Sequence, residues 1–158
     1  FDEPGAAEVL ARVVGDTLEA TTDPACVAEA EHVIIVVGTP VDEHLNPEPR
    51  AVPDAISAIA DHLRDGQLLV LRSTLYPGVT AMVERLVATM GKDVDVAFCP
   101  ERIAEGKAMT ELFELPQIVS ARTDRAMELS TKLFRALTSQ VVLLTPVEAV
   151  LPKLYPDT

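Results

Sequence analysis

The sequence is poor in cysteine, histidine and positive charge, and it contains no tryptophan. Cys26 and Cys99 stand alone, in no metal-ligand spacing, so we expect two free thiols and no metal site. Cys99 has no histidine or lysine near it in the sequence to lower its pKa, which favours a buried thiol. The 13 Lys and Arg against 25 Asp and Glu give a net charge of −12. Nucleic acid is therefore not an expected partner, because phosphate contacts need a basic face.

Long apolar runs and a glycine-rich loop are also missing. No apolar run approaches the ~20 residues of a membrane helix, and the start of the chain lacks the regions of a secretory signal. We therefore expect a cytoplasmic protein with no membrane partner. The seven glycines nowhere form G-x-G-x-x-G, so the chain contains no pyrophosphate cradle of the dinucleotide type.

Short apolar segments alternate with segments of helical periodicity along the whole chain. The expected strands are Leu18–Thr21, Val33–Val37, Leu68–Leu71, Val94–Phe98, Gln117–Ser120 and Val141–Leu144. The expected helices are Pro4–Val14, Pro24–Ala30, Val52–Leu63, Val79–Met90, Lys107–Leu115 and Asp124–Leu137, with another beginning at the capping box Thr145–Glu148. This alternation predicts an α/β fold, a mostly parallel, doubly wound sheet with helices on both faces. The segment Val33–Val37 is apolar at every position, so we expect both of its faces to be covered.

Three of the expected strands end in polar residues. The strand 33–37 leads to Thr39, the strand 68–71 to Ser73 and Thr74, and the strand 94–98 to Glu101. Because the carboxyl ends of parallel strands meet at one edge of a sheet, we expect these residues to form one polar pocket.

Each of these residues has a functional and a structural interpretation. Glu101 and Glu105 are candidates for general acid/base work, or they lie on a solvated first helical turn where the helix dipole favours carboxylates. Thr39 binds a ligand or caps a turn. Ser73 and Thr74 are ligand donors or helix N-caps.

Four motifs, taken in order, resemble those of one family. They are Val33–Pro40 with its Gly-Thr-Pro end, Arg72–Gly78 (Arg-Ser-Thr-Leu-Tyr-Pro-Gly), Phe98–Ala108 (Phe-Cys-Pro-Glu-Arg-Ile-Ala-Glu-Gly-Lys-Ala) and Glu114–Val119 (Glu-Leu-Pro-Gln-Ile-Val). Together they resemble the UDP-glucose/GDP-mannose dehydrogenase family over nearly the whole chain. The Pro-Glu-Arg form is most similar to the UDP-N-acetyl-D-mannosamine dehydrogenase branch.

The resemblance implies an activity and a place in a longer protein. It implies NAD as the cofactor and oxidation of the C6 alcohol of a UDP-sugar to the uronic acid, by two hydride transfers and a thioester on a cysteine. It also implies a role in polysaccharide biosynthesis and a homodimer for the full-length protein. Residues 1–145 would be part of a Rossmann-like NAD-binding domain, and residues 146–158 the start of a helix to a central domain. The first strands and glycine fingerprint would precede Phe1, and the catalytic cysteine would follow Thr158, so this fragment alone is expected to be inactive.

The resemblance also implies roles for individual residues. The catalytic residues would be Glu101 for the hydrolytic half of the reaction, Thr74 for holding a catalytic water near the nicotinamide, and Lys153 for stabilising oxyanion character at C6. The residues that bind NAD would be Thr39, Thr74 and Glu105. The residues that contact the substrate would be Arg102, Ile103, Lys153 and Asp157.

Two features near the end of the chain depart from the family pattern. Asp157 stands where the family has asparagine, and Pro152 and Pro156 bracket Lys153 in an expected helix, where each proline removes an N–H donor. They favour the main alternative, a non-catalytic α/β module that binds a nucleotide or a partner chain. A different Rossmann dehydrogenase, such as a 3-hydroxyacid type, accounts for the alternation but not for Pro100-Glu101-Arg102.

Overall fold

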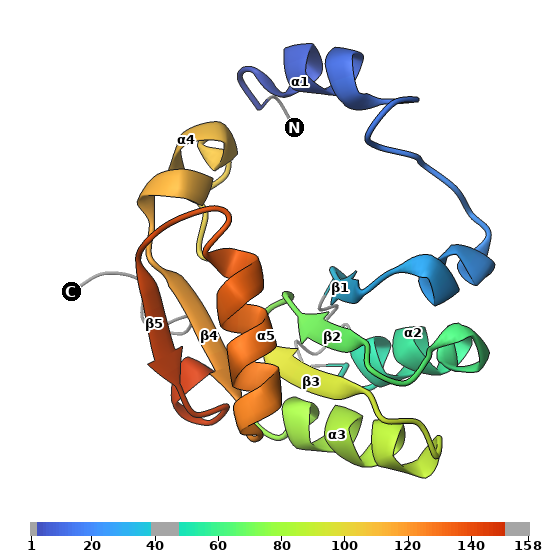
Figure 1. The fold of residues 1–158 in the computed structure, drawn as a ribbon. Coiled ribbons are helices and arrows are strands. Elements are labelled where there is room, and N and C mark those ends of the chain that lie inside the picture. The colour runs from blue at the N-terminus through green and yellow to red at the C-terminus, as the bar shows by residue number, and fades with distance from the viewer. Residues whose placement is uncertain (1–2, 39–47, 151–158) are drawn as a thin grey trace.

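The computed structural model describes residues 3–38 and 48–150, and its strands form one sheet with the order β1-β2-β3-β4-β5 (Figure 1). The strands are β1 (His32–Ile35), β2 (Leu68–Leu71), β3 (Asp95–Phe98), β4 (Gln117–Ala121) and β5 (Val141–Leu144). The helices are α1 (Ala6–Val13), α2 (Ala51–Ala58), α3 (Val79–Thr89), α4 (Ala108–Glu114) and α5 (Asp124–Phe134), with 3₁₀ turns η1 (Pro24–Glu29), η2 (Ala60–His62) and η3 (Glu148–Val150).

The sheet is mostly parallel, as the alternation predicts. β1, β2 and β3 run parallel and in step, with His32 opposite Leu68 and Leu68 opposite Asp95. β4 is antiparallel to β3, and β5 is parallel to β4. The reversal follows from α4, which has seven residues, none of them buried, and lies beyond the strands, above the sheet in Figure 1. A parallel return needs a crossover packed on a face of the sheet, and α4 does not supply it.

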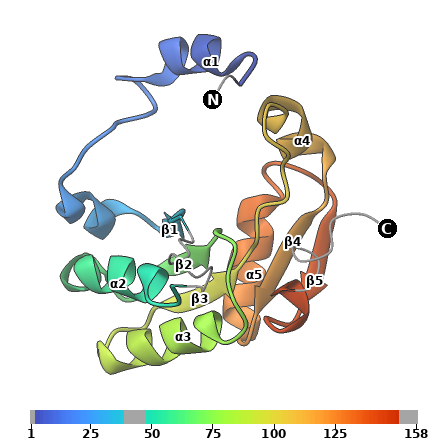
Figure 2. The ribbon, with the colours of Figure 1, turned by 180° about the vertical axis from the view of Figure 1, so that it is seen from behind.

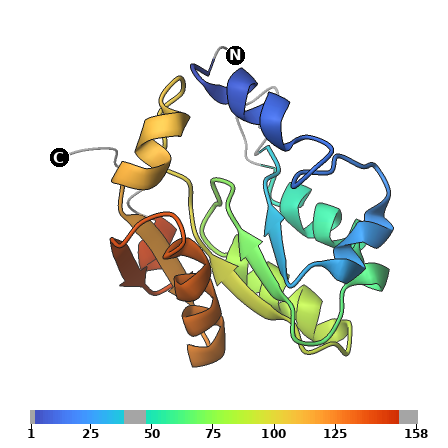
Figure 3. The same ribbon diagram turned by 45° about the horizontal axis from the view of Figure 1, so that its top comes forward.

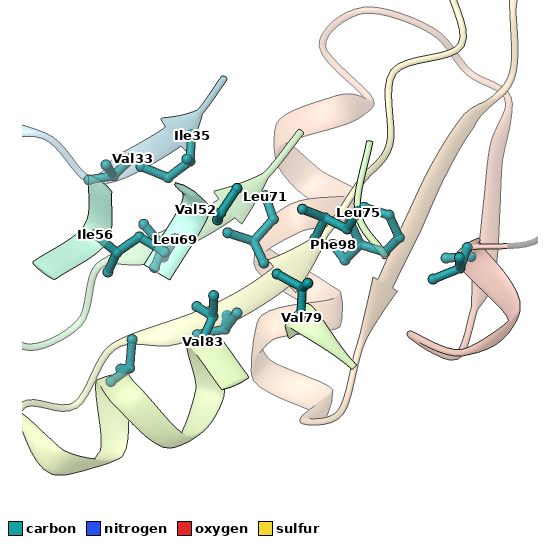
Figure 4. Packing of buried hydrophobic residues seen from close by; sticks show 14 of the residues in the cluster. Val33, Ile35, Val52, Ile56, Leu69, Leu71, Leu75, Val79, Val83 and Phe98 are labelled. Carbon is teal, nitrogen blue, oxygen red and sulfur yellow. The ribbon is translucent and has the colours of Figure 1, made fainter. Parts of the chain in front are cut away.

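Helices cover both faces of the sheet, which confirms the doubly wound fold. Side chains of β2 alternate, so that Leu69 and Leu71 join the core under α2 and α3 while Leu68 and Val70 join the core under α5. Figure 4 shows Val52 and Ile56 of α2 and Val83 of α3 gathered around the first pair. Figure 2 shows α2 and α3 from the other side of the molecule.

β1 is covered on one face only, contrary to the expectation from its apolar sequence. Val33 and Ile35 are buried against α2, whereas Ile34 is 47% exposed and Val36 is 75% exposed. The difference arises because α5 packs on β2, β3 and β4. Both faces of β1 are therefore apolar, but the described residues cover only one of them.

The segment Leu18–Thr21 is not a strand. Leu18 forms an isolated bridge with Val14, and the N–H of Gly15 donates to the Leu18 carbonyl at 2.9 Å. Gly15 has φ +83°, a left-handed conformation that glycine adopts without steric cost, so the chain makes a tight turn here instead of extending. Helix α1 itself buries none of its residues and lies apart from the sheet on the same side as α4 (Figure 3).

Side chains cap two of the expected helix starts, one of them at the predicted capping box. The Asp23 carboxylate accepts a hydrogen bond from the Ala25 N–H at 2.9 Å, although the helix that follows is the 3₁₀ turn η1. At the capping box, Glu148 accepts from the Thr145 N–H at 2.8 Å and Thr145 Oγ1 accepts from the Glu148 N–H at 3.4 Å. Within the described residues this box caps the single turn η3. In the same part of the chain, no helix is long and apolar enough to cross a membrane.

Candidate functional site

The carboxyl ends of β1, β2 and β3 lie side by side, as the sequence predicts. Backbone hydrogen bonds continue past the strands: the Arg72 N–H donates to the Ile35 carbonyl at 3.0 Å and the Cys99 N–H to the Leu71 carbonyl at 2.9 Å. The Glu101 N–H then donates to the Arg72 carbonyl at 3.2 Å. We call this edge the strand rim and define it as residues 36–38, 72–74 and 99–105. The expectation of a polar pocket here stays a prediction, since Thr39 lies outside the described residues.

Ser73 joins two strand ends. Its hydroxyl oxygen accepts a hydrogen bond from the Val37 N–H at 2.8 Å, and the side chain is buried. Helix α3 begins at Val79, after Gly78. The interpretation of Ser73 and Thr74 as helix N-caps is therefore wrong, because both residues lie too far before the helix. Thr74, the next residue of the rim, is partly exposed.

Arg72 is a buried residue of the rim. Its guanidinium forms an ion pair with the Glu101 carboxylate and donates to Gln117 Oε1 at 2.9 Å and to the Cys99 carbonyl at 3.2 Å. The guanidinium carbon also lies 4.7 Å from the centroid of the Phe134 ring. An arginine is tolerated at this depth because its charge is paired and its donors meet acceptors.

The Glu101 carboxylate is engaged through both oxygens. Arg72 pairs with Oε2, while Oε1 accepts hydrogen bonds from the backbone N–H groups of Arg102 at 2.7 Å and Ile103 at 3.0 Å. The side chain is 30% exposed, so one side of it faces outward from the rim. The interpretation of Glu101 and Glu105 on a solvated first helical turn is wrong, because α4 begins only at Ala108.

The loop between β3 and α4 is fixed at its far end by Glu111. The Glu111 carboxylate accepts from the Ala104 N–H at 2.8 Å and lies 3.7 Å from the Lys107 ammonium. Gly106 has φ +80°, so the turn into the helix uses a conformation that disfavours other residues. The loop thus holds Arg102 and Ile103, both partly buried, next to Glu101, while Glu105 is exposed.

The comparisons with known proteins agree with this geometry. Residues 1–138 match the family model described as the UDP-glucose/GDP-mannose dehydrogenase family, NAD binding domain.

The chain belongs to the UDP-glucose/GDP-mannose dehydrogenase family.

This confirms the resemblance carried by the four motifs, and the match to an NAD-binding domain confirms NAD as the cofactor.

Individual relatives show the same likeness over part of their length. The chain is 31% identical over 121 residues to a UDP-N-acetyl-D-mannosamine dehydrogenase of Methanococcus maripaludis, and 32% identical over 145 residues to a UDP-glucose 6-dehydrogenase of Haloferax volcanii. These alignments cover 74% and 85% of this chain, but only 28% and 34% of the relatives. Among solved structures, the UDP-D-ManNAc dehydrogenase from Pyrococcus horikoshii superposes with a TM-score of 0.90 at 27% identity, covering 98% of this chain and 38% of that one. The chain therefore spans about a third of the length of these dehydrogenases.

The described rim offers donors and acceptors that suit part of an NAD site. Thr74 carries a partly exposed hydroxyl at the end of β2, and Glu105 an exposed carboxylate after β3. Open α/β sheets bind nucleotides outside the carboxyl ends of their parallel strands, which is where both residues lie. The glycine-rich pyrophosphate cradle is absent from the 158 residues, so the rim fits the cofactor in part.

Of the eight predicted site residues, five lie in the described chain and all five are on or beside the rim. They are Thr74, Glu101, Arg102, Ile103 and Glu105. Thr39, Lys153 and Asp157 lie outside the described residues, so their roles stay predictions. No group of three or more His, Cys, Asp or Glu side chains that could hold a metal ion occurs in residues 3–38 and 48–150.

Cys99 is a buried thiol, as predicted. Burial raises its pKa to about 12, against a smaller lowering from a backbone hydrogen bond at Ser120 and from the charge of Arg72. The thiolate is the nucleophilic form of cysteine, so this residue is unsuited to covalent catalysis at neutral pH. Cys26 is a free and exposed thiol.

Sequence reasoning missed Arg72, Gln117 and Glu111. Arg72 opens one of the four motifs, but the motif alone gives it no role. The sequence signal that points to this pair is Arg72, a charged residue directly after four apolar positions, together with Gln117, which opens a later strand. Those residues meet only in the fold, since Arg72 lies 29 residues from Glu101 and 45 from Gln117.

Proposed function

We propose that this chain is part of an NAD-dependent nucleotide-sugar 6-dehydrogenase, which oxidises the C6 alcohol of a UDP-N-acetylmannosamine-like UDP-sugar to the uronic acid. Residues 1–145 contribute part of its NAD-binding domain, and residues 146–158 lead to a central domain. The observation that carries the proposal is the anchored Glu101 carboxylate at the rim of three parallel strands, in a chain of this family. The similarity to a UDP-N-acetyl-D-mannosamine dehydrogenase supports the choice of sugar.

The residues at the strand ends would form two groups, one that contacts NAD and one that contacts the UDP-sugar. Bound NAD would supply the hydride acceptor. Thr39, Thr74 and Glu105 would contact it, and Thr74 would also hold a water molecule for the later hydrolysis. The side chain of Arg102 and the backbone of Ile103 would bind the UDP-sugar. Support for this division comes from the position of the described members on or beside one rim.

Glu101 would serve the hydrolysis that ends the reaction. The oxidised C6 carbon is then a thioester on a cysteine outside this chain. Water adds its oxygen to the carbonyl carbon and the C–S bond breaks, which gives the carboxylate and the free thiol. One proton of the water ends on the sulfur and the other passes to Glu101 and is released to solvent. A carboxylate held at a fixed orientation is suited to accept that proton.

The remaining assignments rest on the family resemblance. Lys153 would stabilise negative charge that develops on the C6 oxygen, and Asp157 would contact the substrate beside it. The full-length protein would be a cytoplasmic homodimer that acts in polysaccharide biosynthesis.

The experiment uses the intact protein that carries this chain. It is mixed with NAD and, in separate assays, with UDP-N-acetylmannosamine, UDP-glucose or GDP-mannose, and NADH absorbance is followed together with the sugar product. We expect NADH with UDP-N-acetylmannosamine, two molecules for each uronic acid formed. Binding of a nucleotide sugar by calorimetry without any NADH would instead favour the non-catalytic module, which the prolines around Lys153 and the change at Asp157 already favour.

A further inference from the structure

We infer that Arg72 is a positioning residue, which holds the Glu101 carboxylate in the orientation that the hydrolytic step requires. The inference rests on the proposed function, because it assigns Glu101 to that step. Arg72 would not touch the substrate. It would act through Glu101, and the contacts around both side chains support this division of roles.

Glu101 lies in a loop, where contacts of its side chain set the orientation of the carboxylate. It follows Pro100 in a loop outside any helix or strand, and its side chain is 30% exposed. Arg72 restrains one carboxylate oxygen, while the N–H groups of Arg102 and Ile103 restrain the other. Restraint of both oxygens fixes the plane of the carboxylate as well as its position, and a proton acceptor in catalysis needs both.

The guanidinium of Arg72 is itself held by three other elements. It donates to Gln117 Oε1 at the start of β4 and to the Cys99 carbonyl at the end of β3, and it packs over Phe134 of α5. Gln117 is fixed in turn, because its amide donates to the carbonyls of Leu112 at 3.3 Å and Leu115 at 3.5 Å. The position of the Glu101 carboxylate is thereby set by the sheet and by α5.

A guanidinium suits this role better than an ammonium. Arg72 meets a carboxylate, an amide oxygen and a backbone carbonyl while it lies over an aromatic ring. A planar fork with five N–H donors can meet all of these at once, whereas lysine offers a compact point charge. Arg72→Lys is therefore expected to restore part of the function that an uncharged substitution removes.

An arginine–carboxylate pair at the opposite end of β3 provides a control. Arg125 pairs with Asp95, the first residue of β3, at 2.9 Å and with Asp93 at 2.6 Å. Asp95 is buried, so loss of Arg125 also leaves a carboxylate without its arginine. The partner of Arg125, Asp95, lies at the amino end of β3, whereas the strand rim lies at the carboxyl end of that strand.

The test compares Arg72→Met, Arg72→Lys and Arg125→Met in the intact protein. NADH formation is followed from the first turnover with NAD and the nucleotide sugar, and intact mass is measured after quenching. For Arg72→Met we expect the initial burst of NADH to remain while steady-state turnover falls by about 100-fold, with accumulation of a covalent sugar adduct. The kcat/KM for the nucleotide sugar should change by less than about threefold, because the steps up to the covalent adduct are unaffected, and KM should fall together with kcat. Arg72→Lys should lose less turnover, and Arg125→Met should keep the wild-type ratio of burst to steady-state rate.

The result that overturns the inference is a proportional loss of burst and steady-state rate in both Arg72 variants, without adduct, because a purely structural role lowers the amount of folded enzyme.

Hydrogen exchange of the Arg102 and Ile103 amides, read by mass spectrometry, gives a measurement independent of activity. We expect exchange at these amides to become at least about tenfold faster in Arg72→Met and to stay unchanged in Arg125→Met. If the wild-type protein forms no NADH with any nucleotide sugar, the proposed function fails, and unchanged exchange at these two amides would separately refute the positioning by Arg72. If Arg72→Met does not fold, Arg72→Lys carries both measurements.

Discussion

Gln117→Leu separates stability from function at the strand rim. Gln117 is buried and makes three hydrogen bonds, one to the charged guanidinium of Arg72 and two longer ones to the carbonyls of Leu112 and Leu115. Leucine fills a similar volume but makes none of them. The substitution leaves Arg72 in contact with Glu101 and Cys99, but it removes the acceptor that holds the guanidinium to β4.

The contacts set the size of the expected destabilisation. A hydrogen bond to a charged group contributes about 1.5–3 kcal/mol, and each of the two long bonds about 0.5 kcal/mol. The apolar leucine side chain returns about 1 kcal/mol through burial. We therefore expect Gln117→Leu to lower the free energy of unfolding by about 2 kcal/mol.

Gln67 provides the control for this experiment. It is also buried and bridges three partners at the opposite end of the sheet, accepting from the Arg64 N–H at 2.6 Å and donating to the Val27 and Ala30 carbonyls at 2.7 Å. Three neutral hydrogen bonds at about 1 kcal/mol each, less the same gain from leucine, give about 2 kcal/mol for Gln67→Leu. We therefore expect the two variants to lose similar stability, while only Gln117 contacts Arg72.

The assay has two parts. Urea unfolding followed by circular dichroism gives the stability of the 158-residue chain, and NADH formation by the intact protein gives the turnover. We expect similar midpoints for the two variants, with turnover reduced about tenfold in Gln117→Leu and changed less than about twofold in Gln67→Leu. Equal losses of turnover in both variants would refute the reasoning, because the effect of Gln117 would then be a general loss of stability.

Three further predictions follow from other parts of the structure. Cys26 should react with a thiol reagent in the folded chain, whereas Cys99 should react only after unfolding. Burial raises the pKa of Cys99 from 9.0 to about 12, so its contribution to stability is fully present below about pH 9 and declines as the pH rises toward 12. Gly106→Ala should cost about 1 kcal/mol in urea unfolding because of the positive φ, and Gly106→Asn should cost less. The 158-residue chain alone should reduce no NAD with UDP-sugars; a burst of NADH on mixing with UDP-N-acetylmannosamine would contradict this.

The sequence predicts the elements of this fold better than their arrangement. Strand β2 has the predicted bounds because four consecutive apolar residues are flanked by Gln67 and Arg72. The antiparallel direction of β4 was not predictable from alternation, because it depends on whether α4 packs on the sheet, and a seven-residue helix leaves that undecided. The exposure of Ile34 and Val36 was not predictable either. An apolar sequence shows that a strand face can be buried, but not whether another element covers it.

The site was predicted in part for the same physical reason. Thr74 and Glu101 lie on one rim because parallel strands share the direction of their carboxyl ends, and this follows from element order alone. The anchoring of Glu101 does not, because it requires Arg72, Gln117 and Phe134 to converge from three elements separated by tens of residues. Local sequence patterns carry no information on such contacts.

Glu101 is the group that completes the proposed reaction. Glu101→Gln in the intact protein retains an oxygen acceptor for the backbone N–H groups of Arg102 and Ile103 but removes the proton acceptor. Intact mass spectrometry after mixing with NAD and UDP-N-acetylmannosamine should show a covalent sugar adduct that persists while NADH formation stops after the burst. Continued turnover at the wild-type rate, with no adduct, would contradict the account.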